Sequence, residues 1–121
     1  MSVFRPLAEM PPLPIWDGIL ARVVEGREMT FAIVELDAGA AATKHQHPNE
    51  QLGIVLKGSI TFTIGDETRT LAVGDTYEIA GDVPHEATAG ADGAVVIDVF
   101  APVRADWGAL EVGDPRPPRW P

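Results

Sequence analysis

Three histidines are the residues of this sequence whose types and spacing most clearly suggest chemistry. His45 and His47 are separated by one residue, and His85 is the third and last histidine. On an extended chain, residues two apart point to the same face, so the imidazoles of His45 and His47 can bind one metal ion. Gln51 shares their parity, whereas Glu50 points the other way if the segment stays extended. The alternative is that these are ordinary surface or core histidines.

His85 has a backbone suited to a metal ligand. It follows Val83 and Pro84, and proline restricts both its own backbone and that of the residue before it. A stiff backbone helps to place a ligand accurately. Three imidazole nitrogens with one amide or carboxylate oxygen leave a position open for water or substrate, as in catalytic metal sites. The sequence thus predicts one divalent ion, and this donor set accepts Ni, Zn, Mn, Co or Fe.

Composition and charge narrow the classes of partner. The chain has 121 residues, which suits one domain. Its content of 45% hydrophobic and 22% charged residues is typical of a globular protein. Nine Lys and Arg against eighteen Asp and Glu give a net charge of -9. We therefore expect neither nucleic acid nor an anionic membrane as a partner. The absence of cysteine excludes disulfides, thiolate metal sites and cysteine nucleophiles.

The sequence predicts no membrane span and no secretory signal. No apolar run reaches the roughly 18 residues that a membrane helix requires. Arg5, Glu9 and three prolines, Pro11, Pro12 and Pro14, interrupt the N-terminal region, whereas a secretory signal has an unbroken apolar helix. We therefore expect a cytoplasmic protein.

Short β-prone segments bounded by Gly or Pro must position the histidines. Their spacing is close to that of a sandwich or small barrel, which predicts an all-β fold of the jelly-roll kind. A loop is expected at Gly90–Gly93, and Arg104–Leu110 has the pattern of one or two helical turns. The expected strands are Ile19–Glu25, Met29–Leu36, Leu52–Leu56, Ser59–Ile64, Thr68–Val73, Thr76–Ile79 and Ala94–Phe100.

Proline-rich ends flank the predicted barrel. Residues 1–16 form an extended arm that we expect to lie against the domain or a partner subunit, with Ile15 and Trp16 docking near its end. Residues 17–110 form the barrel, and residues 111–121 form a tail that cannot be a central strand. Trp107 and Trp120 are expected to anchor this tail. The arm offers an exchangeable strand, so we expect a homodimer.

Two motifs make the chain resemble the cupin superfamily. The first cupin motif places a glycine, His-x-His, an acidic or amide ligand and a second glycine at set intervals, which here are Gly39, His45, His47, Gln51 and Gly58. The second motif ends in histidine. Its positions in this sequence are Gly74, Ala80 in place of proline, Asp82 in place of glycine, and His85. The resemblance implies a double-stranded β-helix, the cupin form of the jelly roll.

Two local features are similar to pectin-degradation cupins of the KdgF type. A glutamine, Gln51, stands where most metal-binding cupins have glutamate, and the strand near Asp98 continues to Arg104 in a similar frame. That family converts 4,5-unsaturated monouronates into linear 5-keto sugars. The resemblance implies a sugar-acid substrate beside Asp98, Phe100 and Arg104. It also implies a divalent metal ion, whose ligands would be His45, His47, Gln51 and His85.

The residue types agree with this chemistry, although plainer interpretations remain. An aspartate within an apolar strand needs a partner, so Asp98 is either a proton carrier or the partner of Arg104 in a salt bridge. Asp98 and Phe100 share one face of their strand, and Phe100 is either substrate-binding or barrel lining. Arg104 either binds a substrate carboxylate or is a solvated loop residue. The other face of the same strand is expected to supply core residues, namely Val95, Ile97 and Val99.

Two other functions fit the same residues. One is an iron-dependent dioxygenase that uses the same pocket, although a neutral amide compensates the charge of Fe(II) less than a carboxylate would. The other is a cupin that binds a sugar or another metabolite without catalysis. Tyr77 could also reach the cavity, but the sequence leaves open which face of its strand is the inner one.

Overall fold

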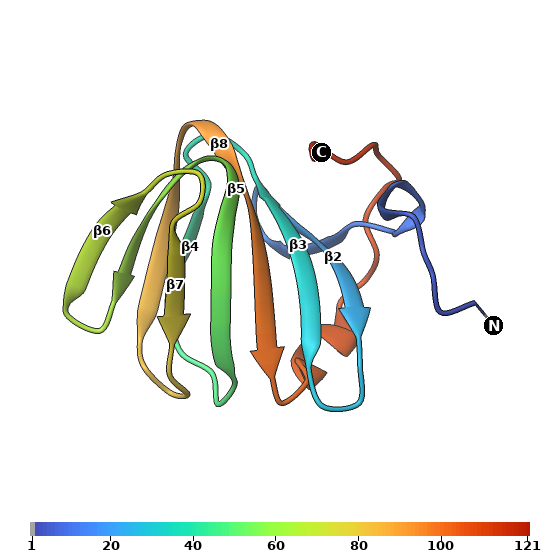
Figure 1. Ribbon diagram of the computed structural model, residues 1–121, viewed down its shortest axis with the longest axis horizontal. Coiled ribbons are helices and arrows are strands. Elements are labelled where there is room, and N and C mark those ends of the chain that lie inside the picture. Colours follow the sequence, from blue (N-terminus) through green and yellow to red (C-terminus); the bar gives the residue numbers. More distant parts are fainter. Residues whose placement is uncertain (1) are drawn as a thin grey trace.

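The structure is a computed structural model that describes residues 2–121. Within those residues the chain forms β-strands and two short 3-10 helices (Figure 1). No helix among them is long and apolar enough to cross a membrane. In chain order, the elements are η1 (Leu7–Glu9), β1 (Leu13–Trp16), β2 (Ile19–Glu25), β3 (Thr30–Leu36), β4 (Ala41–His45), β5 (Glu50–Ile64), β6 (Glu67–Leu71), β7 (Thr76–Ile79), β8 (His85–Ala101) and η2 (Ala105–Ala109).

The two longest strands, β5 and β8, bend and so belong to both layers of the barrel. The late half of β8 pairs with β3 and with the early half of β5, which in turn pairs with β7. The early half of β8 pairs with β4 and with the late half of β5, which pairs with β6. All of these pairings are antiparallel. Figure 1 shows β5, β8, β3 and β2 side by side with β4 behind them. This double-sheet arrangement is the jelly roll that the sequence predicts.

Both long strands turn the corner of the barrel at a pair of glycines. Gly58 and Gly93 have φ of 72° and 74°, and a Cβ at Gly58 would overlap the carbonyl oxygen of Gly93. The register of β5 against β8 shifts at this point. The predicted loop at Gly90–Gly93 is therefore wrong, because the ladder resumes on both sides of the bend. For the same reason, the separate strands expected at Leu52–Leu56 and Ser59–Ile64 are one strand.

Strand prediction fails where hydrophobic periodicity is weak. The bounds of β2 and β7 agree with the sequence, and those of β3 and β6 differ by one or two residues. β1 and β4 were not predicted, because β1 contains Pro14 and β4 has mostly exposed side chains. β1 lies at an edge of the sheet and pairs with β2. The N-terminal arm thus docks on its own chain through Ile15 and Trp16, both of which pack against the core.

The core lies between the two layers, and the inward parity of β8 is opposite to the one expected. Val96 and Phe100 are each 2% exposed and belong to the core cluster. Ile97 and Val99 are only half-buried, and neither they nor Val95 belong to that cluster. The prediction that the odd-numbered residues supply core is therefore wrong. In a barrel this small, one inner face provides both the core and the cavity wall.

Glycine positions of the two cupin motifs require an unusual backbone. Gly39, Gly58 and Gly74 all have positive φ. Asp82 stands at the remaining motif position and has φ of 63°, the one positive value of a non-glycine residue among those described. Aspartate tolerates this region better than most residues. The departure from the motif therefore keeps the turn, and the Asp82 amide donates a hydrogen bond to the carbonyl of His47 (2.8 Å).

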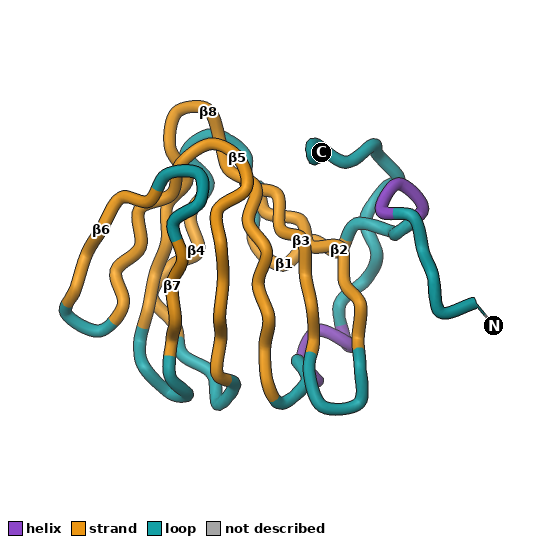
Figure 2. Tube along the Cα trace, in the orientation of Figure 1, coloured by secondary structure: helices purple, strands orange, loops and turns teal. Residues whose placement is uncertain are grey.

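The C-terminal tail packs along the outer side of β2 and β3. Figure 2 shows the tail and the N-terminal arm as irregular segments that lie near one another beside β2. The amide of Gly113 donates a hydrogen bond to the carbonyl of Pro12 (2.8 Å). Arg119 contacts Glu35 and Asp37, and its amide donates to the Glu35 carboxylate (2.9 Å). The tail contains no strand, as its prolines predict.

Candidate functional site

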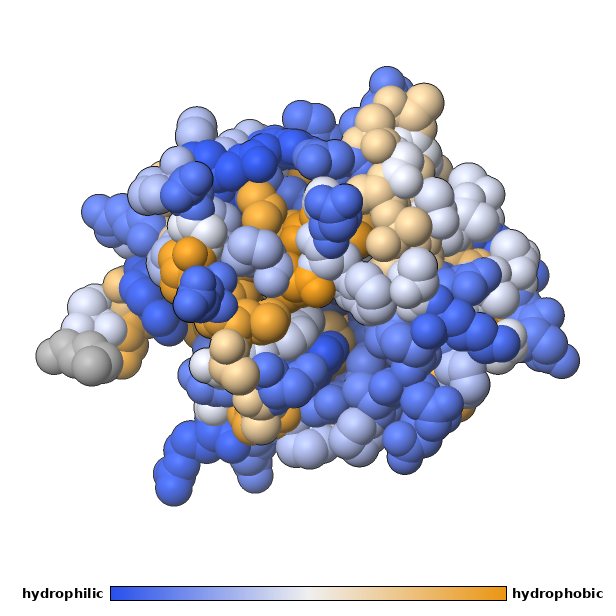
Figure 3. Space-filling model, turned by 180° about the vertical axis from the view of Figure 1, so that it is seen from behind, coloured by the Kyte–Doolittle hydropathy of each residue, from blue (hydrophilic) through white to orange (hydrophobic). Residues whose placement is uncertain are grey.

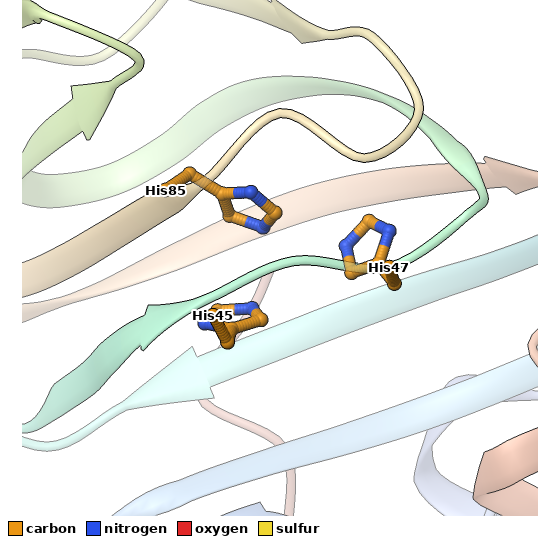
Figure 4. A group of neighbouring side chains, drawn as sticks. All are labelled: His45, His47 and His85. Atoms are coloured by element: carbon orange, nitrogen blue, oxygen red, sulfur yellow. The ribbon is translucent and has the colours of Figure 1, made fainter.

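The three histidines come together from three segments. His45 ends β4, His85 begins β8, and these two residues are register partners in the β4–β8 pairing. His47 follows in the loop before β5. One ligand atom from each residue lies within 4.8 Å of the others. Figure 4 shows the three rings gathered around a shared space, so the geometry can hold a metal ion.

The backbone sets the tautomer of each imidazole. The Nδ1–H groups of His45, His47 and His85 donate to the carbonyl oxygens of Thr43 (2.6 Å), Asn49 (3.0 Å) and Val83 (2.8 Å) respectively. Each Nε2 then carries a lone pair, which is the arrangement that metal-binding histidines adopt. Nε2 of His85 is buried and has no hydrogen-bond partner among the described residues. A cation would satisfy this nitrogen, so the residues fit a metal ion.

Burial keeps two of the imidazoles neutral. Desolvation lowers the pKa of His47, with a smaller contribution from the charge of Arg104. Desolvation also lowers the pKa of His85 to about 4. Neutral imidazoles are the form that binds metal. Gln51 is buried beside them while Glu50 is exposed, in agreement with the parity argument.

Gln51 lies between the histidine cluster and Asp98. Its Oε1 is 3.2 Å from Nε2 of His47, and its Nε2 donates to Oδ1 of Asp98 (3.1 Å). The same Oδ1 accepts a second hydrogen bond from the hydroxyl of Tyr77 (2.6 Å). Gln51 therefore presents its amide oxygen toward the cluster.

Asp98 is buried without a cationic partner. It is 7% exposed, and burial raises its pKa to about 6, although the hydrogen bonds from Tyr77 and Gln51 oppose the increase. Among the described residues it makes no salt bridge, because Arg104 pairs with Asp106 instead. The salt-bridge interpretation of Asp98 is therefore wrong. Both of its hydrogen bonds fall on Oδ1, which leaves Oδ2 without a hydrogen bond to the described residues, and Asp98 lines the cavity.

Arg104 is held at the cavity by two aromatic rings. Its Cζ lies 4.7 Å from the ring centroid of Phe100 and 4.3 Å from that of Trp107, distances at which cation–π attraction operates. Nε and Nη2 donate to both carboxylate oxygens of Asp106 (3.0 and 2.8 Å), and this pairing lowers the pKa of Asp106. The side chain of Arg104 is only 10% exposed, so it is not a solvated loop residue.

One cavity of about 340 Å³ joins these groups. Its wall includes every metal-ligand candidate as well as Asp98, Phe100 and Arg104. Phe100 is barrel lining, because it belongs to the core cluster and to the wall of the cavity. Seen from behind the view of Figure 1, apolar residues gather around a hollow near the centre of the face, with hydrophilic residues around them (Figure 3).

Sequence reasoning missed several residues of the site. Trp107, expected to anchor the tail, lines the cavity beside Arg104, and Trp16 lies 5.1 Å from the His45 ring. Asn49 donates to the carbonyls of Pro102 and Val103, which links the loop of His47 to the segment before Arg104. Tyr77 on β7 reaches Asp98 on β8 across β5, which lies between these two strands. The sequence suggested that Tyr77 could reach the cavity but left its inner face open, and the contact with Asp98 could not be predicted because it depends on cross-strand register.

Comparisons with known proteins agree with this architecture. The model of the cupin domain family matches residues 32–100. Pectin degradation protein KdgF from Dickeya dadantii is 32% identical over 101 residues, which cover 82% of this chain and 92% of that protein. The solved structure of KdgF from Halomonas sp. has a TM-score of 0.80 and 29% identity, with 88% of this chain and 98% of that one covered.

A second solved structure supports the fold alone. An RmlC-like cupin from Shewanella frigidimarina has a TM-score of 0.82 at 23% identity, with 88% of this chain and 96% of that one covered. Similarity at this level of identity shows a shared architecture and does not transfer an activity. The chain therefore belongs to the cupin family, and its relatives within that family include the pectin degradation protein KdgF.

Proposed function

We propose that the protein converts a 4,5-unsaturated monouronate into the linear 5-keto sugar acid. The observation that carries this proposal is the placement of a buried carboxylate, Asp98, and a sequestered guanidinium, Arg104, on the wall of the same cavity as the imidazole cluster. The similarity to KdgF, a pectin degradation protein, supports a sugar acid as the substrate.

The reaction is an isomerisation and needs no oxidant or reductant. The bond between C1 and the ring oxygen breaks, the C1 hydroxyl loses its proton, and C1 becomes an aldehyde. The ring oxygen stays on C5 as an enolate. Protonation at C4 then converts the enolate into the C5 ketone, so the proton removed from the C1 hydroxyl is balanced by the proton gained at C4.

Three side chains have distinct roles in this proposal. Asp98 takes the proton of the C1 hydroxyl and returns a proton to C4, through the Oδ2 atom that makes no hydrogen bond to the described residues. Arg104 binds the substrate carboxylate. Because Asp106 engages Nε and Nη2, the contact with substrate uses Nη1 or displaces Asp106. Phe100 and Trp107, the two rings that pack against Arg104, exclude water from the ion pair between Arg104 and the substrate carboxylate.

Four residues would hold a divalent ion beside this substrate: His45, His47, Gln51 and His85. Such an ion would polarise a substrate oxygen and stabilise the negative charge that develops on it. The buried, unpartnered Nε2 of His85 supports this assignment.

The test is an assay with purified, metal-loaded protein and a 4,5-unsaturated monouronate. We expect the ultraviolet absorbance of the conjugated enol ether to disappear faster than in buffer. In deuterated water, NMR should show deuterium at C4 of the product. A sample with bound metal that gives no acceleration over buffer would contradict the proposal.

The same assay separates the other two functions. Oxygen consumption and strict iron dependence would indicate a dioxygenase, and tight binding of the uronate without turnover would indicate a binding protein. The predicted homodimer and the predicted cytoplasmic location form part of this proposal. Light scattering at micromolar protein concentration tests the first, and fractionation of the source cells tests the second.

A further inference from the structure

Tyr77, Gly53 and Asp98 lie in one row across three neighbouring strands. Gly53 on β5 is the register partner of Tyr77 on β7 and of Asp98 on β8. The Tyr77 ring lies over Gly53, because a Cβ built at Gly53 would overlap the ring. The missing side chain at position 53 thus lets the Tyr77 hydroxyl reach Oδ1 of Asp98 at 2.6 Å.

A second contact restrains the Tyr77 ring. It packs against Phe62, with 4.4 Å between ring centroids, and Tyr77 is 8% exposed. Burial, followed by the charge of Asp98, raises the pKa of Tyr77 well above its usual value, so the phenol remains a hydrogen-bond donor. Among the described residues, Tyr77 makes no hydrogen bond or ring pair with the three histidines, so we expect its effect on the site to pass through Asp98.

The orientation of the Gln51 carboxamide depends on what Asp98 presents to it. A carboxamide has an oxygen acceptor at one end and an N–H donor at the other, and the two ends are nearly equal in size. A carboxylate only accepts hydrogen bonds, so it binds the NH₂ end and directs the oxygen the other way. In this chain that direction is toward Nε2 of His47 (3.2 Å). A flipped amide would present N–H groups to the space between the imidazoles.

We propose that Tyr77 is a positioning residue that reaches across Gly53 and holds Asp98, so that Asp98 orients the oxygen of Gln51 toward the metal centre. Asp98 then has two separable roles, one in orienting Gln51 and one in proton transfer. The inference rests on the metal site of the proposed function, but not on the identity of the substrate.

Side-chain amide NMR tests this orientation without any assay of activity. The sequence contains only Gln46, Gln51 and Asn49 as carboxamide residues, so the ¹⁵N spectrum has few side-chain NH₂ signals, and Gln51→Glu identifies those of Gln51. In the metal-free protein, we expect the Gln51 hydrogens to exchange slowly with water. Tyr77→Phe keeps the ring and removes the hydroxyl, and it should shift these signals and speed their exchange.

Zinc affinity provides a second readout. Changes to residues that orient metal ligands typically cost about 10–100-fold in affinity, so Tyr77→Phe should raise the Zn²⁺ dissociation constant about 10-fold in a chelator competition. Thr63→Val is the matched control, because the Thr63 hydroxyl also makes a 2.8 Å hydrogen bond across two strands, to Thr68, on an exposed surface. This control should leave both readouts unchanged.

Two variants of Asp98 separate its roles and apply even if Tyr77→Phe does not fold. The carboxamide of Asp98→Asn can present its carbonyl oxygen to both Tyr77 and Gln51, so zinc affinity and the Gln51 signals should be largely retained while turnover is lost. Asp98→Ala should lose turnover, shift the Gln51 signals and raise the Zn²⁺ dissociation constant about 10-fold, so that saturating metal still fills the site. The proposal is overturned if Tyr77→Phe changes neither readout, if Thr63→Val changes them equally, or if Asp98→Asn and Asp98→Ala weaken zinc alike.

The outcome is independent of the test of the proposed function. A protein that does not turn over unsaturated uronate, yet shows the expected zinc and NMR changes, would keep this inference and lose the reaction. A protein that turns over the uronate, yet shows no effect of Tyr77→Phe on Gln51 or zinc, would keep the reaction and lose this inference.

Discussion

Two buried polar clusters, one on β2 and β3 and one on β4, β5 and β8, differ in how their polar atoms are satisfied. Val34 and Leu36 line the cavity, so Glu35 between them faces the outer side of β3. There it pairs with Arg22 of β2, and the two residues are 2% and 0% exposed. The inner cluster is the set of imidazoles with Gln51 and Asp98.

The outer cluster is completed by the C-terminal tail. Arg22 donates to the carbonyl of Arg116 (2.7 Å), and Glu35 accepts from the amide of Arg119 (2.9 Å). Nε of Arg22 and Oε1 of Glu35 have no hydrogen-bond partner among the described residues, but Arg22 pairs with Glu35 through Nη1, and Oε1 lies 3.7 Å from Nε of Arg119. The chain thus supplies its own counter-charges at this place.

The inner cluster has no such completion. Each Nδ1 donates to a backbone carbonyl, and the buried Nε2 of His85 has no hydrogen-bond partner among the described residues. A buried polar group that the chain completes stabilises the fold, whereas converging groups that it leaves incomplete indicate a site for something else. The four predictions below test this difference, beginning with the largest expected effect.

Removing one imidazole should abolish metal binding without unfolding the chain. We expect His85→Ala to bind no metal under conditions in which the wild type is loaded, and to lose turnover. Metal at 100 times its dissociation constant stabilises a protein by about 2.7 kcal/mol, and this increment should be missing in thermal unfolding of the variant. Lys44→Gln changes an exposed residue beside the motif, and this control variant should retain the stabilisation by metal. Metal content equal to wild type in His85→Ala would refute the site.

Breaking the outer ion pair should affect stability and leave the metal centre unchanged. Glu35→Gln leaves Arg22 as an uncompensated buried charge, which typically costs about 3–5 kcal/mol. Chemical denaturation measures this loss. Glu67→Gln is the control, because the Glu67–Arg69 pair is exposed and such pairs contribute at most about 1 kcal/mol. A change in zinc affinity of folded Glu35→Gln would show that the two clusters are coupled.

Asp98→Ala should slow the reaction more than it affects metal content. Loss of a proton carrier typically costs about 100-fold or more in turnover, and we expect that decrease in kcat at saturating metal. Metal analysis of the same sample should show full occupancy. Turnover within tenfold of the wild type would assign Asp98 the orienting role alone.

Arg104→Lys should weaken substrate binding and have less effect on kcat. Lysine keeps the charge but loses the planar fork and its stacking between Phe100 and Trp107. We expect KM to rise about 10-fold, the size of one lost charge-assisted hydrogen bond. Arg69→Lys, on the exposed strand β6, is the control. An unchanged KM would mean that the substrate carboxylate binds elsewhere.

Much of the site could be predicted from local pattern alone. The interval between His45 and His47, the parity of Gln51 and the restraint before His85 are consequences of backbone geometry over a few residues. The glycines of the motifs are similar, because their positive φ values are local requirements. These features led to the cupin family and the jelly roll, which the structure and the comparisons confirm.

Contacts that depend on the bend of the barrel could not be predicted. Whether Val96 or Ile97 faces inward depends on how β8 pairs with β3 and β5. The position of Trp107 depends on where η2 packs. The alignment of Tyr77, Gly53 and Asp98 joins three segments whose register no single segment specifies.

The sequence by itself determined which groups this protein can offer, since the histidines, the amide and the turn glycines are set by identity and spacing. Only the tertiary structure decided that Asp98 accepts hydrogen bonds from Tyr77 and Gln51 rather than pairing with Arg104. It also decided that Arg22 and Glu35 make hydrogen bonds with the C-terminal tail. The physical reason is that a buried polar group must find its partner across strands. That partner is chosen by register and closure of the sheet, and neither is encoded within one segment.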